Sequence, residues 1–456
     1  MFSRPKGKEI MKHKKTIGML ALLLCTTPAW VLASPADNPD DPAYVTRTVV
    51  ADTAKAKAEA PTVSELAAKA PREVTLVDRK ATPETAALYQ YLAALPQTGH
   101  ILYGHQNDVH HKMFRVNSGS NSDTKDVTGS IAGVVGMDAL SLTGAELTLT
   151  PSERKAGLTY TDKLVKITEA ASQQGAIITL SMHMPNFAAV AQKGQKNGQW
   201  DYSGYSPNNL NGNVGHRVLP GQDLNPVFNG YLDLVADYLL QLQARNIPVI
   251  FRPLHEHNGS WFWWGGNNID EGDFLELWHY IVKYMRDTKG VHNCLYAYSP
   301  NGPFFDESGY LNRYPGDRYV DILGVDTYND EQKPEWFKNL DKTLAVMQKA
   351  AQEHGKLIAL TEAGVRDGGA LPVTGNRDKR WFQNVNAVCL KHQVPYFLTW
   401  ANFEKLEHNF FEPYMVSDTK GHEMINEFIN FYNEPGTIFA DGVTDFTKLP
   451  APTVKN

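Results

Sequence analysis

Short apolar runs alternate along most of the chain with segments whose apolar residues recur at helical spacing. The apolar runs span eight ranges: 101–105, 134–138, 176–183, 249–256, 294–300, 321–328, 357–362 and 396–402. One helical segment carries its apolar stripe at Leu232, Val235, Leu239 and Leu242, a spacing that places residues on one helix face. Thr82-Pro83 predicts the start of a helix, and Gly355 predicts the end of another. The pattern therefore predicts strands and helices in alternation.

Near-continuous apolar strands that alternate with helices are typical of a parallel sheet whose outer face is covered. Eight such strands are the number that closes a barrel. We therefore predict an α/β fold consisting of a single (β/α)8 TIM barrel. An open, doubly wound sheet is the alternative, but no GxGxxG or P-loop motif follows any of the strands, which weighs against it.

The first residues have the pattern of a secretory signal peptide. Basic residues precede an apolar run at 17–24, and small residues follow it up to a predicted cleavage site before Ser34. The apolar run is too short to span a bilayer, and either Met1 or Met11 can be the start. We therefore predict a signal peptide at 1–33, a secreted or periplasmic protein, and no membrane attachment once the peptide is removed.

The rest of the chain divides by composition. Residues 34–75 are rich in Ala, Pro, Asp and Lys and lack sustained apolar periodicity, which predicts a flexible leader with at most a short helix near 63–70. The catalytic (β/α)8 domain is expected at 76–445 and a C-terminal tail at 446–456.

The cysteines offer no redox or zinc spacing. Cys294 and Cys389 lie in predicted buried elements, where two small apolar side chains are the simpler interpretation and a bridge is the alternative. Cys25 could accept a lipid, but the bulky Leu24 before it fits a lipoprotein site poorly.

The composition excludes some partners. With 42% hydrophobic residues and 21% charged residues the chain can bury a large core. Its 44 Lys and Arg against 50 Asp and Glu give a charge of −6, and no basic run occurs beyond the first fifteen residues. A nucleic-acid partner is therefore not expected, and we predict a monomer.

Glutamates end two of the predicted strands. Glu256 and Glu362 follow apolar runs, where an unpaired carboxylate is costly unless it has a purpose. In a (β/α)8 barrel the strand ends meet at one mouth. Two carboxyl groups facing each other there are what glycosidic bond cleavage requires, and their separation decides between retention and inversion. The structural alternative for either glutamate alone is a salt-bridged or solvated acid.

Aromatic residues accompany these acids. The loop at 259–266 holds three of the nine tryptophans, among them Trp261, and Trp400 ends the last strand. Sugar rings stack on such side chains, although part of the loop is expected to be a buried satellite core. His255 and His257 flank Glu256, but HExxH and the strand-end ligands of metallohydrolases are missing. We therefore predict no metal and no cofactor.

These motifs resemble the glycoside hydrolase family 26 β-mannanases over roughly residues 80–435. The segment 252–265 is similar to the family's acid/base segment, 360–364 to its nucleophile segment, and 324–328 to its strand-six segment. The resemblance implies that Glu256 is the general acid/base and Glu362 the nucleophile of a retaining double displacement. It also implies substrate-binding roles for these residues: His183, Asn186, His255, Trp261, Asp326, Tyr328 and Trp400. Ala401 stands where some members carry Arg, which leaves the neighbouring sugar subsite open.

The resemblance predicts a secreted retaining hydrolase of β-1,4-mannosidic linkages, with mannan or manno-oligosaccharides as substrate. The same fold acting on xylan or mixed-linkage β-glucan is the alternative. A silent glycan-binding barrel would be expected to lack one of the two acids, and a metallohydrolase would need its ligands. The sequence leaves internal versus terminal attack, and tolerance of galactose branches, undecided.

Overall fold

The computed structural model describes residues 40–113, 119–204, 206–403 and 409–455. The predicted signal peptide and Cys25 lie outside these residues. Within them, no helix is both long and apolar enough to cross a membrane.

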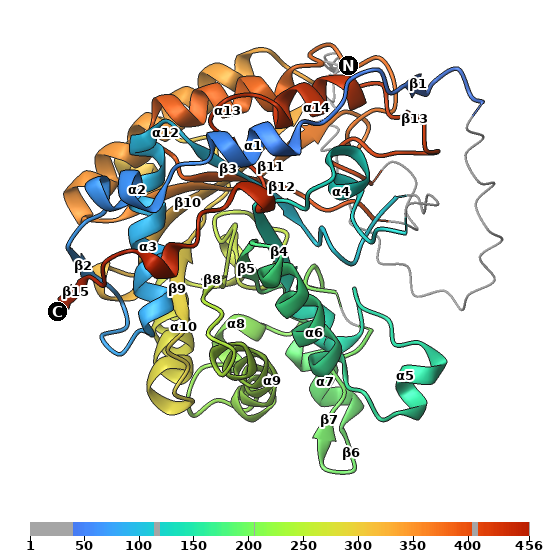
Figure 1. Ribbon diagram of the computed structural model, residues 1–456. Coiled ribbons are helices and arrows are strands. Elements are labelled where there is room, and N and C mark those ends of the chain that lie inside the picture. Colours follow the sequence, from blue (N-terminus) through green and yellow to red (C-terminus); the bar gives the residue numbers. More distant parts are fainter. Residues whose placement is uncertain (1–39, 114–118, 205, 404–408, 456) are drawn as a thin grey trace, which may run out of the picture.

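Eight parallel strands form a closed barrel (Figure 1). They are β3 (Ile101–Gln106), β4 (Val134–Asp138), β5 (Ile177–Ser181), β8 (Val249–Arg252), β9 (Cys294–Tyr298), β10 (Ile322–Asp330), β11 (Leu357–Arg366) and β12 (Tyr396–Thr399). Each pairs with the next, and β12 pairs with β3 from Tyr396 opposite Leu102 to Thr399 opposite His105. The (β/α)8 prediction is therefore confirmed, and each predicted apolar run holds one strand.

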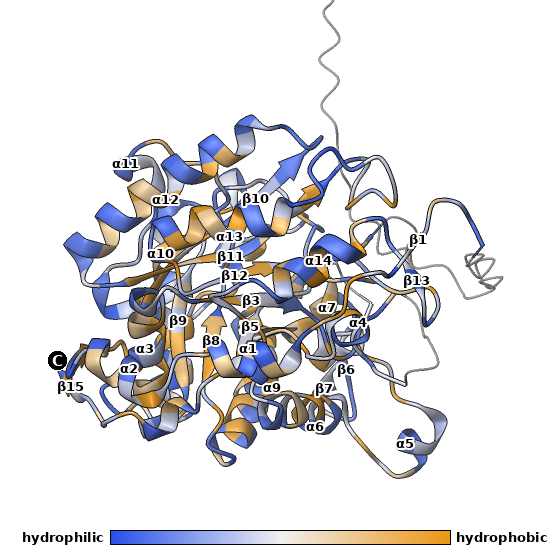
Figure 2. Cartoon of the chain, turned by 45° about the horizontal axis from the view of Figure 1, so that its top comes forward, coloured by the Kyte–Doolittle hydropathy of each residue, from blue (hydrophilic) through white to orange (hydrophobic). Residues whose placement is uncertain are grey.

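Helices surround the barrel. The longer ones on the outside are α6 (Tyr160–Gln173), α9 (Asn225–Gln243), α10 (Glu271–Lys283), α12 (Glu335–His354), α13 (Trp381–Lys391) and α14 (Ile425–Tyr432). Shorter pieces lie in the connections: α4 (Asp123–Thr128), α5 (Pro151–Lys155), α7 (Phe187–Lys193), α8 (Val214–Arg217), α11 (Glu307–Tyr310) and the hairpin β6 (Gln195–Lys196) and β7 (Gln199–Trp200). The predicted stripe of α9 is fully buried, and Gly355 ends α12 in the left-handed conformation, as predicted. Figure 2 shows the strands mostly in hydrophobic colours and the outer side of α12 in hydrophilic ones.

One helix closes the amino-terminal end of the barrel. α3 (Pro83–Ala94) begins where predicted, and the Thr82 side chain accepts a hydrogen bond from the amide of Thr85. Its buried residues, such as Leu88 and Leu92, share one apolar cluster with residues near the starts of the strands, such as Leu102. The amino-terminal end is therefore filled by apolar packing, which leaves the carboxyl ends of the strands for polar chemistry.

The prediction of a flexible leader at 34–75 is wrong for residues 40–75. This segment forms β1 (Val45–Thr46), α1 (Thr53–Glu59), α2 (Val63–Lys69) and β2 (Glu73–Thr75). The short helix expected near 63–70 is confirmed as α2, whose Leu66 is fully buried.

Distant partners explain the order of this segment. β1 pairs with β13 (Lys420–Gly421), and β2 pairs with β15 (Thr453–Lys455), which lies in the predicted C-terminal tail. The remaining short strand, β14 (Thr437–Ile438), pairs with the start of β3. These contacts join residues hundreds of positions apart, so local periodicity could not reveal them.

The two cysteines are free and buried. The interpretation of Cys294 and Cys389 as two apolar side chains is therefore confirmed, and the bridge is excluded.

Candidate active site

Glu256 lies just beyond the end of β8 on an unusual backbone. The strand stops at Arg252, directly before Pro253, which has no N–H to donate to a neighbouring strand. Leu254 and Glu256 both have positive φ, at 50° and 52°. Non-glycine residues rarely adopt this conformation, which is costly and tends to occur at functional sites. The Glu256 amide donates to the carbonyl of Ser299 across 2.7 Å, which anchors the turn to the neighbouring strand end.

The carboxyl group of Glu256 is almost completely buried. Its Oε2 accepts a hydrogen bond from Trp261 Nε1 at 2.7 Å. The pKa of Glu256 is raised to about 8. Burial is the largest cause, and the nearby carboxylates of Glu362 and Asp326 add to it, whereas the hydrogen bond from the indole acts in the opposite direction. Glu256 therefore holds a proton at neutral pH and can give it up to a leaving group.

Glu362 reaches the mouth because β11 is irregular. Val325 pairs with Leu360, but the next residue of β10, Asp326, pairs with Glu362, so Thr361 is an extra residue in β11. Side chains alternate across a strand, and a bulge changes which face the following residues present. This bulge allows both Thr361 and Glu362 to lie on the inner side of the barrel.

Both carboxylate oxygens of Glu362 accept hydrogen bonds. Tyr328 donates its hydroxyl to Oε1, and Arg252 donates Nη2–H to Oε2 across 2.8 Å. The exposed fraction of Glu362 is 5%. Two donors, one of them charged, therefore hold this group in place and favour negative charge on it.

Asp326 lies beneath the mouth and does not line it. It is fully buried. Its Oδ2 accepts from Arg252 Nη1 at 2.6 Å, and its Oδ1 accepts from the hydroxyls of Ser299 and Thr361 at 2.6 and 2.7 Å. Asp326 is thus bonded to three donors within the protein, and its predicted contact with substrate stays a prediction.

Arg252 links the two strand ends that carry Asp326 and Glu362. Burial would lower the pKa of Arg252, but the charges of Asp326 and Glu362 outweigh it and the pKa is raised. The sequence did not single out Arg252, which is only the first residue of the motif at 252–265. An arginine inside an apolar run was the signal for a buried charge with partners.

A chain of three side chains borders the same site. Asp138 Oδ2 lies 2.6 Å from His183 Nδ1, and His183 Nε2 lies 3.1 Å from His255 Nε2. Burial would lower the pKa of His183, but the charge of Asp138 and the hydrogen bond with it raise it overall. Burial lowers the pKa of His255 well below the usual range. These opposite shifts favour His183 as the donor and His255 as the acceptor in the contact between the two rings.

The tryptophans divide as the sequence suggested. Trp261 is 39% exposed, whereas Trp263 and Trp264 are buried and form the satellite core. Trp400 is mostly buried, and its ring centroid lies 5.7 Å from that of His183. Trp261 and Trp400 therefore flank the acids and histidines with aromatic surface.

Asn186 makes three hydrogen bonds within the protein. Its Nδ2 donates to the carbonyls of Asn209 and Asn211 at 2.8 Å each, and its Oδ1 accepts from the amide of Ala189 at the start of α7. It is 1% exposed. Asn186 therefore holds the loop before α8 in place, and its predicted contact with a sugar stays a prediction.

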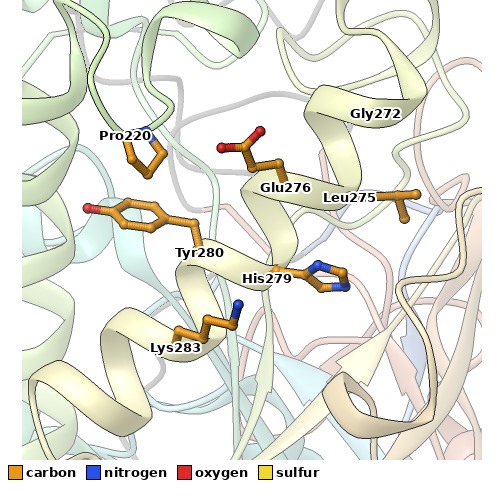
Figure 3. A pocket seen from close by; sticks show the side chains of 7 residues that line it. All are labelled: Pro220, Gly272, Leu275, Glu276, His279, Tyr280 and Lys283. Carbon is orange, nitrogen blue, oxygen red and sulfur yellow. The ribbon is translucent and has the colours of Figure 1, made fainter.

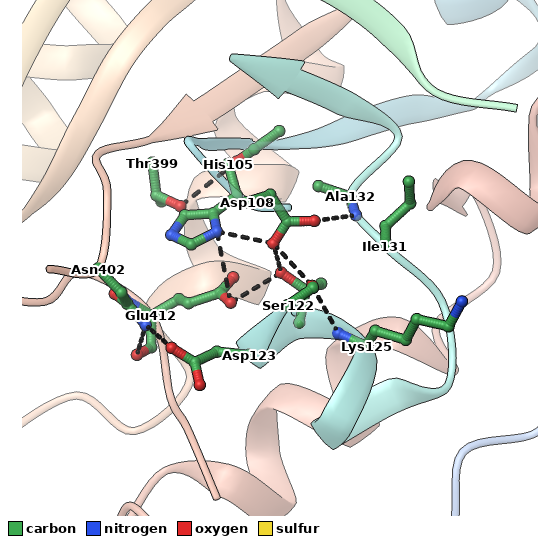
Figure 4. A network of polar contacts seen from close by, with 12 residues as sticks. His105, Asp108, Ser122, Asp123, Lys125, Ile131, Ala132, Thr399, Asn402 and Glu412 are labelled. Carbon is green, nitrogen blue, oxygen red and sulfur yellow. Dashed lines mark hydrogen bonds and ion pairs between the residues drawn. The ribbon is translucent and has the colours of Figure 1, made fainter. Parts of the chain in front are cut away.

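A second polar network, drawn in Figure 4, joins the ends of β3 and β12. His105, Asp108 and Glu412 place three atoms of the kind that bind metals within 4.8 Å of one another. These atoms already have partners: His105 Nδ1 lies 2.9 Å from Asp108 Oδ1 and 3.5 Å from Glu412 Oε1, and Glu412 Oε1 accepts from the hydroxyl of Thr124 at 2.7 Å. The network is therefore accounted for as a buried clamp between the two strand ends.

A hollow of about 380 Å³ lies on the outer face of α10 (Figure 3). It is lined by Pro220, Gly272, Leu275, Glu276, His279, Tyr280 and Lys283. Six of these residues lie on α10 and Pro220 lies between α8 and α9, and neither Glu256 nor Glu362 lines the hollow.

A closed (β/α)8 barrel with two acidic side chains at the carboxyl ends of its fourth and seventh strands has the class of site that glycoside hydrolases use. Residues 77–411 match Glycosyl hydrolase family 26. The chain belongs to this family, and the resemblance found in the sequence is confirmed.

Three relatives illustrate the similarity. The mannan endo-1,4-beta-mannosidase of Bifidobacterium adolescentis is 34% identical over 403 residues, which cover 84% of this chain and 37% of that protein. The catalytic domain of a GH26 endo-beta-1,4-mannanase of Bacillus sp. is 34% identical with a TM-score of 0.74, covering 85% of this chain and 99% of that one. A modular endo-beta-1,4-mannanase of Cellulomonas fimi is 32% identical with a TM-score of 0.70, covering 83% and 81%. The chain thus spans little more than a third of the Bifidobacterium protein.

Proposed function

We propose that this protein is a secreted, retaining hydrolase of β-1,4-mannosidic linkages that acts on mannan and manno-oligosaccharides as a monomer. One observation supports the chemistry above all. The surroundings of the two acids differ, because Glu256 is buried with a raised pKa while Glu362 is held by two donors. Two carboxyl groups whose environments separate their protonation states are the arrangement that acid and nucleophile require.

In the first step, a carboxylate oxygen of Glu362 attacks the anomeric carbon of the sugar. Glu256 gives its proton to the departing glycosidic oxygen, so the bond breaks to leave a shortened chain and a mannosyl ester of Glu362. In the second step, Glu256, now a carboxylate, takes a proton from water as the water attacks the same carbon. The ester bond breaks, Glu362 is released, and the configuration at the anomeric carbon is that of the substrate after two inversions.

Arg252 and Tyr328 donate hydrogen bonds to the carboxylate of the nucleophile Glu362. They stabilise the charge of Glu362 before attack and after release, when the group is a free carboxylate. Trp261 contacts Glu256 directly and, with Trp400, offers rings on which a sugar can stack.

The choice of mannan as substrate rests on similarity. The two solved relatives described above carry endo-beta-1,4-mannanase in their names. Secretion rests on the basic and apolar pattern of residues 1–33.

The deciding experiment is time-resolved proton NMR of the purified protein with linear mannohexaose. A first product with the β-anomeric configuration is expected, and its size distinguishes internal from terminal attack. A first product with the α configuration contradicts retention. Cleavage of xylan or mixed-linkage β-glucan, with mannohexaose left intact, contradicts the proposed substrate.

Two variants test the assignment of the acids. Glu362→Ala is expected to abolish turnover while the fold is kept. Glu256→Ala is expected to impair mannohexaose far more than an aryl mannoside with a good leaving group, which needs little protonation. Equal impairment of both substrates by Glu256→Ala contradicts its role as acid.

A further inference from the structure

The strands β10 and β11 stay paired well beyond the bulge, up to Asp330 opposite Arg366. Arg366 donates Nε–H to Asp330 Oδ1 at 2.7 Å and Nη2–H to Oδ2 at 3.1 Å. Its carbonyl accepts from the amide of Glu331 at 2.7 Å. The planar fork of the guanidinium is therefore held in one orientation by a carboxylate on the neighbouring strand.

The guanidinium lies over the ring of Tyr328. Its Cζ is 4.2 Å from the ring centroid, well within the range of a cation–π contact. Phe411 meets the same ring edge-on, with centroids 5.7 Å apart. Gly364 pairs with Tyr328, and a Cβ there would come within 3.3 Å of Tyr328 and 2.5 Å of Phe411. The ring of Tyr328 is thus confined from several directions.

Tyr328 is the residue whose hydroxyl donates to Oε1 of Glu362. Burial raises the pKa of Tyr328 well above its usual value, and the carboxylates of Glu362 and Glu256 raise it further, whereas Arg366 lowers it. A cation beside a phenol makes its O–H a stronger donor. The charge of Arg366 therefore acts in the direction that strengthens the hydrogen bond to Glu362.

We propose that Arg366 is a positioning residue for the nucleophile, acting through the ring and hydroxyl of Tyr328. This inference rests on the proposed role of Glu362. Asp330 holds Arg366, Arg366 holds Tyr328, and Tyr328 holds one oxygen of Glu362, so the far ends of β10 and β11 serve the reaction without touching the reacting atoms.

The consequence is an effect on turnover more than on substrate affinity. The Arg366 side chain is 33% exposed, so its removal opens no cavity in the core. If the hydroxyl of Tyr328 is misoriented, one oxygen of Glu362 loses its donor. The carboxylate then samples a wider range of orientations, so kcat falls because attack on the anomeric carbon requires a defined geometry.

The experiment compares Arg366→Met and Asp330→Asn with the parent enzyme on mannohexaose. Arg366→Met is expected to lower kcat about tenfold and to change KM less than about twofold. A tenfold loss corresponds to one cation–π contact of moderate strength. Asp330→Asn keeps the shape but weakens the hold on Arg366, and a smaller loss in kcat is expected. Arg286→Met is the matched control, because Arg286 makes the same two-pronged contact with Asp287 elsewhere; its kcat is expected to stay unchanged.

A double-mutant cycle with Tyr328→Phe tests whether Arg366 acts through the hydroxyl. The phenylalanine ring keeps the stack but has no donor for Glu362, so Arg366→Met is expected to have little further effect on kcat in that background. An undiminished loss in the Tyr328→Phe background overturns the inference, as does a rise in KM with kcat unchanged, which would indicate a direct sugar contact.

The outcomes separate this inference from the proposed function. If Glu362→Ala keeps full activity, the proposed function fails and the inference fails with it. If the parent enzyme cleaves mannohexaose, Glu362→Ala is inactive and Arg366→Met has unchanged kinetics, then only the role of Arg366 is overturned. Should Arg366→Met fold poorly, Asp330→Asn carries the same test, because it leaves Arg366 and its packing in place.

Discussion

The indole Nε1–H of Trp261 donates to Oε2 of Glu256 across 2.7 Å. Gly259 makes this possible, since a Cβ there would come within 2.3 Å of the indole ring. The contact opposes the effect of burial, which raises the pKa of Glu256 to about 8. Trp261 thus sets how firmly Glu256 holds its proton, in addition to offering its ring to a sugar.

Trp261→Phe is expected to shift the alkaline limb of the kcat/KM profile to higher pH. The general acid must be protonated, so activity falls as pH rises through the pKa of Glu256, near 8 in the parent. Losing the donor removes an interaction that favours the charged form, so this pKa rises. The measurement is kcat/KM on mannohexaose across neutral and alkaline pH. The control is Trp278→Phe on α10, whose indole donates to the carbonyl of Tyr319. A limb that moves to lower pH would refute the assignment.

Arg252→Met is expected to destabilise the protein by about 3–5 kcal/mol, because it leaves two buried acids without their cation. The partners are Asp326 and Glu362, at 2.6 and 2.8 Å. Urea unfolding at neutral pH is the measurement. Adding Asp326→Asn to Arg252→Met removes one of the uncompensated charges and is expected to recover part of the loss. A single variant within about 1 kcal/mol of the parent would show that the buried ion pairs are not needed.

Asn186→Ala is expected to lower stability by about 1–3 kcal/mol, because the carbonyls of Asn209 and Asn211 lose their donor and each hydrogen bond contributes about 0.5–1.5 kcal/mol. Limited proteolysis is expected to cut the loop before α8 faster. Asn384→Ala on α13, whose amide bonds an exposed carboxylate, serves as control. If Asn186→Ala instead lowers kcat/KM with stability unchanged, the side chain contacts sugar as the sequence resemblance implied.

Glu412→Gln is expected to flatten the dependence of stability on pH. Burial raises the pKa of Glu412 from 4.5 to about 8. The folded protein therefore keeps a proton here that the unfolded chain releases, so the associated stability is full below about pH 4.5 and is lost as pH rises toward about 8. Each such proton contributes a slope of about 1.4 kcal/mol per pH unit inside that window.

Urea unfolding at several pH values within that window measures the slope. Glu59→Gln at an exposed position in α1 is the control and is expected to keep the parent slope. A Glu412→Gln slope as steep as that of the parent would show that this carboxyl does not hold its proton.

Much of the fold could be predicted because its signals are local. Apolar runs at 134–138 or 396–402 have the length and continuity of strands buried on both faces, and they became β4 and β12. The stripe on α9 and the end of α12 at Gly355 depend on residues a few positions apart. The prediction of a flexible segment at 40–75 was wrong because its order depends on distant residues. Val45 and Val74 pair with strands close to the other end of the chain.

The candidate site divides in the same way. Glu256 and Glu362 were recognisable because an acid at the end of an apolar run stands out from its neighbours. The protein partners of Asp326 and Asn186 were not recognisable, because both residues look like other polar residues at strand ends. Asp326 is bonded by Arg252 and Asn186 by the loop at 209–211, and nothing in the local pattern reveals that these contacts exist.

The sequence alone determined the alternation of strands and helices, the end of the barrel that carries the chemistry, and the identity of the two acids, because side-chain periodicity and the cost of burying charge act at each position separately. Only the tertiary structure decided which protein partners each polar group has, how far the pKa of Glu256 is raised, and how the carboxylate of Glu362 is held. These properties depend on contacts such as that between Arg252 and Glu362, which are 110 residues apart, and hydrogen bonding and electrostatics act over a few ångströms of space, whatever the distance along the chain.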